Sequence, residues 1–149
     1  MDKTDKLIIN YIQSDFPMSE RPYKEAGENL GIEESEIIKR VQKLKDSGVI
    51  RRIGGNFYPD KLGFHSTLCA ACVPEDLIEK FTEIVNGYRG VTHNYIREDV
   101  FNIWFTFIAP STEAIRASLE EIKKMTGVSI ILNLPATDVY KIRAEFKIL

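Results

Sequence analysis

Three features of the 149-residue sequence predict an α+β protein made of two different domains. Apolar residues recur at helical spacing three times within residues 1–48. A glycine pair then separates two short β-type runs, at residues 49–53 and 56–58. From residue 65 onward, β-type and helical runs follow one another in the order β-α-β-β-α-β. The predicted fold is therefore an N-terminal winged helix-turn-helix domain, residues 1–60, and a C-terminal ferredoxin-like (βαββαβ) domain, residues 61–149.

The helices of the first domain have recognisable starts and stops. The second helix begins at Pro22, where proline is tolerated in the first turn, and ends at Gly31. The third ends at Gly48. The two runs around Gly54 and Gly55 are expected to form the wing, and residues 59–63 the linker. The apolar stripe of the first helix consists of Leu7, Ile8, Tyr11 and Ile12.

The second domain shows the same kinds of strand and helix signals. Residues 66–73 are expected to form a strand and residues 75–86 a helix, and residues 90–109 two strands joined near Glu98 and Asp99. Ser111 or Thr112 caps the next helix, which ends at Gly127. The last strand covers residues 129–134, and the alternation over 140–146 would allow one more.

Composition narrows the class of protein. The net charge is -2, with 44% hydrophobic and 28% charged residues, which is typical of a globular domain and gives no general attraction to nucleic acid. A charged N-terminus without a signal peptide, and the absence of a long apolar run, predict a cytoplasmic protein that does not contact membranes. Cys69 and Cys72 lie on a predicted strand and would face opposite sides, so we expect neither a shared metal nor a disulfide.

The hairpin within residues 90–109 carries the most chemistry. Side chains two apart on a strand share a face, so His93, Tyr95 and Arg97 point the same way. On the next strand, Asn102 and Trp104 lie opposite an apolar face of phenylalanine and isoleucine. An imidazole, a phenol, a guanidinium, an amide and an indole on one small sheet exceed what packing requires, so we predict a functional site here.

DNA binding is not the function that the charges of the first domain favour. Residues 1–60 contain ten Lys and Arg against eleven Asp and Glu. The third helix, which would read DNA, begins I-E-E-S-E, and its acidic end would meet the phosphates. Lys39, Arg40 and Lys43 lie further along and could form only a modest basic patch.

Four motifs give a resemblance that covers the whole chain. They are R-R-I-G-G-N-F at 51–57, G-V-T-H-N-Y-I-R at 90–97, N-I-W-F-T-F at 102–107 and L-P-A-T-D-V-Y-K-I-R at 134–143. The two-domain order resembles the Lrp/AsnC family of regulators, and the motifs resemble its enzymatic branch, the sirohaem decarboxylases, in particular the alpha-type subunit. The resemblance implies removal of CO2 from the C12 and C18 acetate groups of sirohaem, giving didecarboxysirohaem in the alternative haem biosynthesis pathway. It implies no cofactor beyond the iron of the substrate, and a paralogous beta-type subunit or a second copy as partner.

A many-acid macrocycle requires cations at its rim and an aromatic surface beneath the ring. The residues expected to bind it are Arg51, Arg52, Phe57, Asn102, Trp104, Lys141 and Arg143. Loss of CO2 requires a proton donor, and His93 is the candidate because an unperturbed imidazole titrates near pH 6.5. Tyr95 is a weaker donor or an orienting partner, and Arg97 would hold an acetate. His93 could instead be an axial ligand of the substrate iron, and one nitrogen cannot serve both roles.

Two other functions remain open at this point. The chain could be a DNA-binding regulator that senses a small effector, or a non-catalytic haem sensor. In each case a four-stranded sheet with helices on one side leaves an apolar face, which we expect another subunit to cover.

Overall fold

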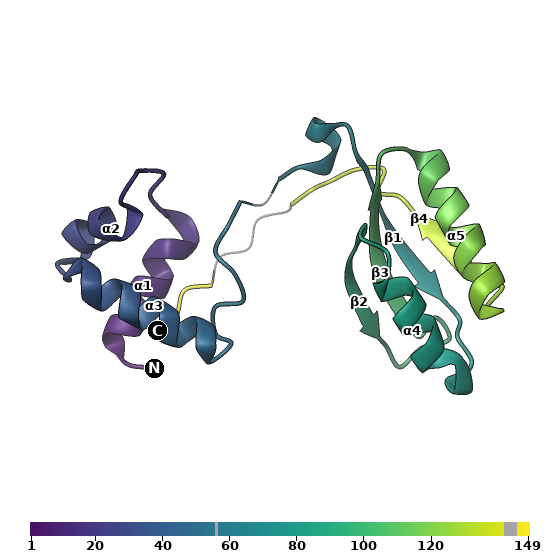
Figure 1. Ribbon diagram of the computed structural model, residues 1–149, viewed down its shortest axis with the longest axis horizontal. Helices are drawn as coiled ribbons and strands as arrows, with labels where there is room; N and C mark the ends of the chain where they lie inside the picture. Colours follow the sequence, from purple (N-terminus) through teal and green to yellow (C-terminus); the bar gives the residue numbers. More distant parts are fainter. Residues whose placement is uncertain (56, 142–145) are drawn as a thin grey trace. The chain divides into compact units, whose positions relative to one another are not determined.

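The computed structural model describes residues 1–55, 57–141 and 146–149, which divide into two compact units (Figure 1). The helical unit comprises Met1–Gly55 with the returning segment Lys141–Leu149, and the sheet unit comprises residues 56–140. Within the described residues, no helix has both the length and the apolar character that a membrane crossing requires.

The helical unit contains the three predicted helices, α1 (Lys3–Ser14), α2 (Pro22–Leu30) and α3 (Glu34–Asp46). Asp2 caps α1 in a capping box with Asp5, which satisfies two backbone N–H groups at the helix start. Gly31 ends α2 with a left-handed φ of 67°. The helices enclose a small core, formed by Ile8, Ala26, Ile37 and Val41.

The two strands of the predicted wing do not form in the part of residues 49–58 that the structure describes. The Ile50 N–H instead donates to the Leu44 carbonyl at 3.0 Å, and Ile50 and Ile53 pack against the helical core. A lone two-stranded ribbon is marginally stable, so anchoring this segment to the end of α3 is the better use of its apolar residues. The first domain is therefore a helix-turn-helix whose described residues lack wing strands.

The last residues of the chain belong to the helical unit. The carboxamide of Asn10 in α1 accepts a hydrogen bond from the Ile148 N–H and donates one to the Ile148 carbonyl. The carboxamide of Gln13 makes the same two bonds with the backbone of Phe146, and all four distances are 2.9–3.1 Å. The Lys6 ammonium donates to the Leu149 carbonyl. The predicted second domain ran to residue 149, whereas the sheet unit ends at Tyr140. Side chains on one helix thus hold the backbone of residues 146–149, which are far away in sequence.

The sheet unit has the predicted element order and the ferredoxin-like topology. Its four strands pair antiparallel in the order β2-β3-β1-β4. The possible strand at 140–146 falls mostly on residues 142–145, which lie outside the described residues. The elements are η1 (Pro59–Leu62), β1 (His65–Ala71), η2 (Glu75–Leu77), α4 (Ile78–Asn86), β2 (Val91–Ile96), β3 (Ile103–Ala109), α5 (Thr112–Thr126) and β4 (Ile131–Leu134).

Helices α4 and α5 cover one face of the sheet (Figure 1). Strand β3 alternates buried and half-buried residues, so Ile103, Phe105 and Phe107 enter the core as the sequence predicted. Phe105 meets Phe81 of α4 edge to face, with ring centroids 6.2 Å apart. On the other side, which we call the open face, large apolar side chains of β1 and β4 remain 37–40% exposed: Leu68, Leu132 and Leu134.

Candidate functional site

The three predicted catalytic residues stand in a row on the open face, along β2 and just beyond it. The His93 and Tyr95 rings lie nearly parallel, with centroids 6.0 Å apart at 26°. The Arg97 guanidinium carbon lies 5.4 Å from the centre of the Tyr95 ring, within cation–π range. All three side chains are exposed. The structure therefore brings an imidazole, a phenol and a guanidinium into one accessible row.

Two hydroxyl groups that the sequence reasoning did not single out meet this row at His93. The pairing of β2 with β3 skips one residue between Val91 and His93, so Thr92 is the extra residue of a β-bulge. Thr92 Oγ1 lies 3.1 Å from His93 Nδ1 and 2.6 Å from Thr106 Oγ1. Thr92 belongs to the motif T-H-N-Y and Thr106 to the motif W-F-T, and this membership is the one feature of the sequence that could have identified them as site residues.

Trp104 and Asn102 extend the site, but both polar groups are already engaged. Trp104 pairs with Tyr95 across the β2–β3 ladder, and its indole N–H donates to the Phe101 carbonyl at 2.6 Å. The Asn102 carboxamide accepts from the Val73 N–H at 2.9 Å and donates to the Val73 carbonyl at 2.8 Å. The face of the Trp104 indole ring therefore remains the part of this side chain that can contact a flat ligand.

The remaining predicted binding residues come from different parts of the chain. Arg51, Arg52 and Lys141 are exposed residues of the helical unit, and Phe57 is a 72% exposed residue of the sheet unit. Arg143 lies outside the described residues. Within the described residues, none of these cations, nor Arg97, pairs with a carboxylate.

No group of three or more metal-ligating side chains occurs within the ranges that the structure describes. Cys69 faces the core, and burial raises the pKa of its thiol to about 12, so it does not become a thiolate ligand. The two cysteines are free, and no disulfide joins them.

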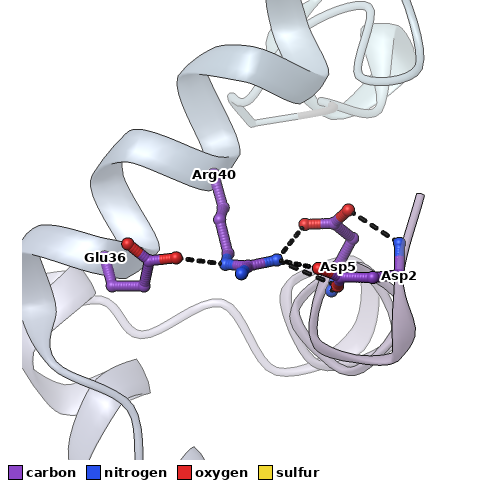
Figure 2. A network of polar contacts seen from close by, with 4 residues as sticks. All are labelled: Asp2, Asp5, Glu36 and Arg40. Carbon is purple, nitrogen blue, oxygen red and sulfur yellow. Dashed lines mark hydrogen bonds and ion pairs between the residues drawn. The ribbon is translucent and has the colours of Figure 1, made fainter.

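One cation of the helix that would read DNA, Arg40, is neutralised within the protein. Figure 2 shows the Arg40 guanidinium of α3 between Glu36 on its own helix and Asp2 and Asp5 at the start of α1, with contacts of 2.6–2.9 Å. The hydrogen bond from Arg40 lowers the Asp2 pKa to about 2. The Asp5 pKa is also lowered, mainly by the hydrogen bond from the Asp2 backbone N–H and to a smaller extent by the one from Arg40. In turn, the hydrogen bonds to the three carboxylates raise the pKa of Arg40. Arg40 therefore fastens α3 to α1.

The rest of the α3 N-terminus is acidic, as the sequence predicted. Glu33, Glu34 and Glu36 occupy the cap and first turn. Among the described residues, Arg21 pairs there with Glu34, and Arg40 pairs with Glu36. A phosphate backbone approaching this end would meet carboxylates.

Family models match both units. The model for the AsnC-like ligand binding domain matches residues 61–141, and that for the siroheme decarboxylase NirDL-like HTH domain matches residues 5–51. The "Siroheme decarboxylase alpha subunit" of Desulfovibrio desulfuricans is 52% identical over 99% of this chain and 84% of its own length. The subunit of the same name from Oleidesulfovibrio alaskensis is 50% identical over 99% of this chain and 89% of its own length.

Solved structures agree with the sequence relatives. The crystal structure of the siroheme decarboxylase NirDL superposes with a TM-score of 0.72 at 28% identity, covering 97% of this chain and 47% of that one. A second NirDL structure, in co-complex with an iron-uroporphyrin III analogue, gives a TM-score of 0.70 at 30% identity, with 97% and 48% covered. An AsnC family transcriptional regulator from Agrobacterium tumefaciens, at 19% identity and a TM-score of 0.78 over 98% of this chain and 96% of its own, shares the fold. With relatives at 50% identity or more along nearly its whole length, the chain belongs to the siroheme decarboxylase family, among the alpha subunits.

Proposed function

We propose that the protein is the alpha subunit of a sirohaem decarboxylase, and that it removes CO2 from the acetate groups at C12 and C18 of sirohaem to give didecarboxysirohaem. The observation that carries this proposal is the row of His93, Tyr95 and Arg97 on the open face of the AsnC-like domain. The row offers a proton donor, a flat ring surface and a carboxylate-binding cation together. Family membership supplies the substrate class.

The chemistry of the substrate accounts for the residues we assign to binding. Sirohaem carries eight carboxylates around a flat iron macrocycle, so its rim needs cations and its plane needs apolar contact. Arg97 holds the reacting acetate, because a guanidinium grips a carboxylate with two parallel hydrogen bonds. Trp104 and Tyr95 supply ring surface. The other carboxylates are assigned to Arg51, Arg52, Lys141 and Arg143, with Phe57 and Asn102 completing the contacts.

His93 lends the proton that starts the decarboxylation and takes it back at the end. Proton transfer from the imidazolium to the pyrrole carbon next to the acetate creates an electron sink. The C–C bond to the carboxylate then breaks, CO2 leaves, and an exocyclic methylene remains. A second proton, from solvent water, is added to the methylene and gives the methyl group, and the ring carbon returns its proton to the imidazole. Each cycle therefore consumes one proton and needs no oxidant, and one nitrogen of His93 acts first as acid and then as base.

The iron belongs to the substrate, and we assign no resident cofactor to the chain. The alternative role of His93 is as an axial ligand of that iron, through the same exposed ring nitrogen. An absorption spectrum of the sirohaem complex distinguishes the two roles. Loss of an axial imidazole in the His93→Ala variant would change the Soret and visible bands, whereas loss of a proton donor would leave them in place.

We propose a paralogous beta-type subunit as partner, and a second copy of this chain when the paralogue is absent. The exposed leucines of the open face, beside a site that stands open to solvent, fit a surface that another subunit covers. We propose that the reaction takes place in the cytoplasm. Sequence-specific DNA binding is not expected, because Arg40 is already paired with three carboxylates.

The decisive experiment is anaerobic incubation with sirohaem, with and without the beta-type subunit, followed by mass spectrometry. Loss of two CO2 units is expected. His93→Ala should abolish this loss, and Arg97→Ala should raise KM. His65→Ala is the matched control, since it removes the only other histidine, which lies at the exposed start of β1. A Soret band without any loss of mass would indicate a haem sensor instead, and salt-dependent retardation of a DNA fragment would indicate a regulator.

A further inference from the structure

The β-bulge at Thr92 changes what surrounds the catalytic imidazole. In a regular strand, adjacent side chains point to opposite faces, so Thr92 would be directed away from His93. Because β2 has one more residue than β3 between the pairs Val91–Phe107 and His93–Thr106, the Thr92 hydroxyl reaches the face on which His93 stands. Bulges re-aim side chains in this manner and are frequent next to active sites.

The hydroxyls form a short chain that ends on one nitrogen of the ring. Thr106 Oγ1 is 2.6 Å from Thr92 Oγ1, which is 3.1 Å from His93 Nδ1. The direct distance from Thr106 Oγ1 to Nδ1 is 3.5 Å, at the limit for a hydrogen bond, so Thr92 is the closer partner. The other ring nitrogen, Nε2, has no hydrogen-bond partner within the described residues, and the side chain is exposed.

We propose that Thr92 and Thr106 are positioning residues for His93, an inference that rests on the proposed function. Nδ1–H donates to Thr92 Oγ1, and the Thr92 hydroxyl donates in turn to Thr106 Oγ1. This chain keeps the Nδ1 proton in place and reserves Nε2 for the substrate. The stacked Tyr95 ring fixes the plane of the imidazole, and the hydroxyls fix its rotation within that plane.

Retention of the Nδ1 proton suits a group that must both give and take a proton at one atom. An imidazolium that transfers its Nε2 proton becomes a neutral ring with Nδ1–H, which is the tautomer that the chain accepts. The same ring can then recover a proton at Nε2 without turning over. A ring with the opposite tautomer would present an N–H where the returning proton must bind. If His93 instead binds the substrate iron, the same arrangement leaves the Nε2 lone pair available, as for metal-bound histidines whose other nitrogen donates a hydrogen bond.

The test reads the tautomer directly, without substrate. The full chain is labelled with ¹⁵N-histidine and studied by NMR at a pH where the rings are neutral, and His65→Gln assigns the two imidazoles. We expect wild-type His93 to carry its proton on Nδ1. Thr92→Val keeps the shape of the side chain and removes the hydroxyl, and should shift the ring toward the Nε2–H form. Thr92→Ser should restore the wild-type signal. A wild-type ring protonated on Nε2, or a Thr92→Val ring identical to wild type, overturns the proposal.

Turnover with sirohaem and the beta-type subunit gives the second readout. Thr92→Val should lower kcat about tenfold with KM nearly unchanged, the scale of a lost supporting hydrogen bond, and Thr92→Ser should recover most of it. If wild-type protein releases no CO2, the proposed function fails while the tautomer result still stands. If wild-type protein is active and Thr92→Val has the wild-type tautomer and kcat, the positioning role fails alone.

Discussion

Replacement of Asn102 by alanine tests whether this residue serves the substrate or the fold. The sequence predicts a binding role for Asn102, but its carboxamide accepts a hydrogen bond from the Val73 N–H and donates one to the Val73 carbonyl. Val73 is only 3% exposed, so water can poorly replace the Asn102 carboxamide as the partner of the Val73 backbone groups. Each net hydrogen bond is worth about 1 kcal/mol and each buried group left unsatisfied costs ~1–3 kcal/mol, so Asn102→Ala should destabilise the sheet unit by about 2–4 kcal/mol.

The chain offers a selective probe of this unit, because Trp104 is its single tryptophan. A destabilisation of that size should lower the Tm read by tryptophan fluorescence by roughly 8 °C or more, given ~4–8 °C per kcal/mol for a unit of this size. Glu83→Ala, an exposed position of α4 whose side chain makes no hydrogen bond or ion pair among the described residues, is the control and should stay within about 0.5 kcal/mol of wild type. An Asn102→Ala variant with the wild-type Tm and a raised KM would refute the structural assignment and restore the binding role.

Three further outcomes follow from other parts of the chain. Asp2 and Asp5, which contact Arg40, have lowered pKa values, so their stabilisation of the helical unit should be complete above about pH 4 and should fade as the pH falls toward the Asp2 pKa of about 2. Arg40→Met should flatten this acid dependence in helical circular dichroism, and an unchanged profile would contradict it. A Cβ on Gly90 would lie 2.1 Å from the Ile108 carbonyl oxygen, so Gly90→Ala should unfold at lower temperature, whereas Gly54→Ala, with no atom within 4 Å, should not. In a thiol-reagent titration of the native protein, half-buried Cys72 should react first and Cys69 only on unfolding; equal rates would be the contrary result.

Local patterns were sufficient to predict most of the architecture. Ser111 and Gly127 bound α5 as predicted, because a hydroxyl cap and a left-handed glycine act over one helical turn. The alternation of β3 identified which of its residues enter the core. The row of His93, Tyr95 and Arg97 was also predictable, since neighbouring members of the row are two residues apart in a strand.

What the sequence did not reveal depends on contacts between distant segments. The bulge at Thr92 arises from the register between β2 and β3, which no single strand encodes. The predicted wing strands do not form in the described part of residues 49–58, because Ile50 and Ile53 have a better apolar surface on the helices than in a two-stranded ribbon. Capture of the chain end by Asn10 and Gln13 joins residues more than 130 positions apart.

That capture makes the sheet unit an insertion within the helical unit, so the polypeptide crosses between them twice. A single protease cut at the first crossing would leave two fragments that the carboxamides of Asn10 and Gln13 still hold together. Removal of the final four residues would correspondingly loosen the first helix rather than the sheet.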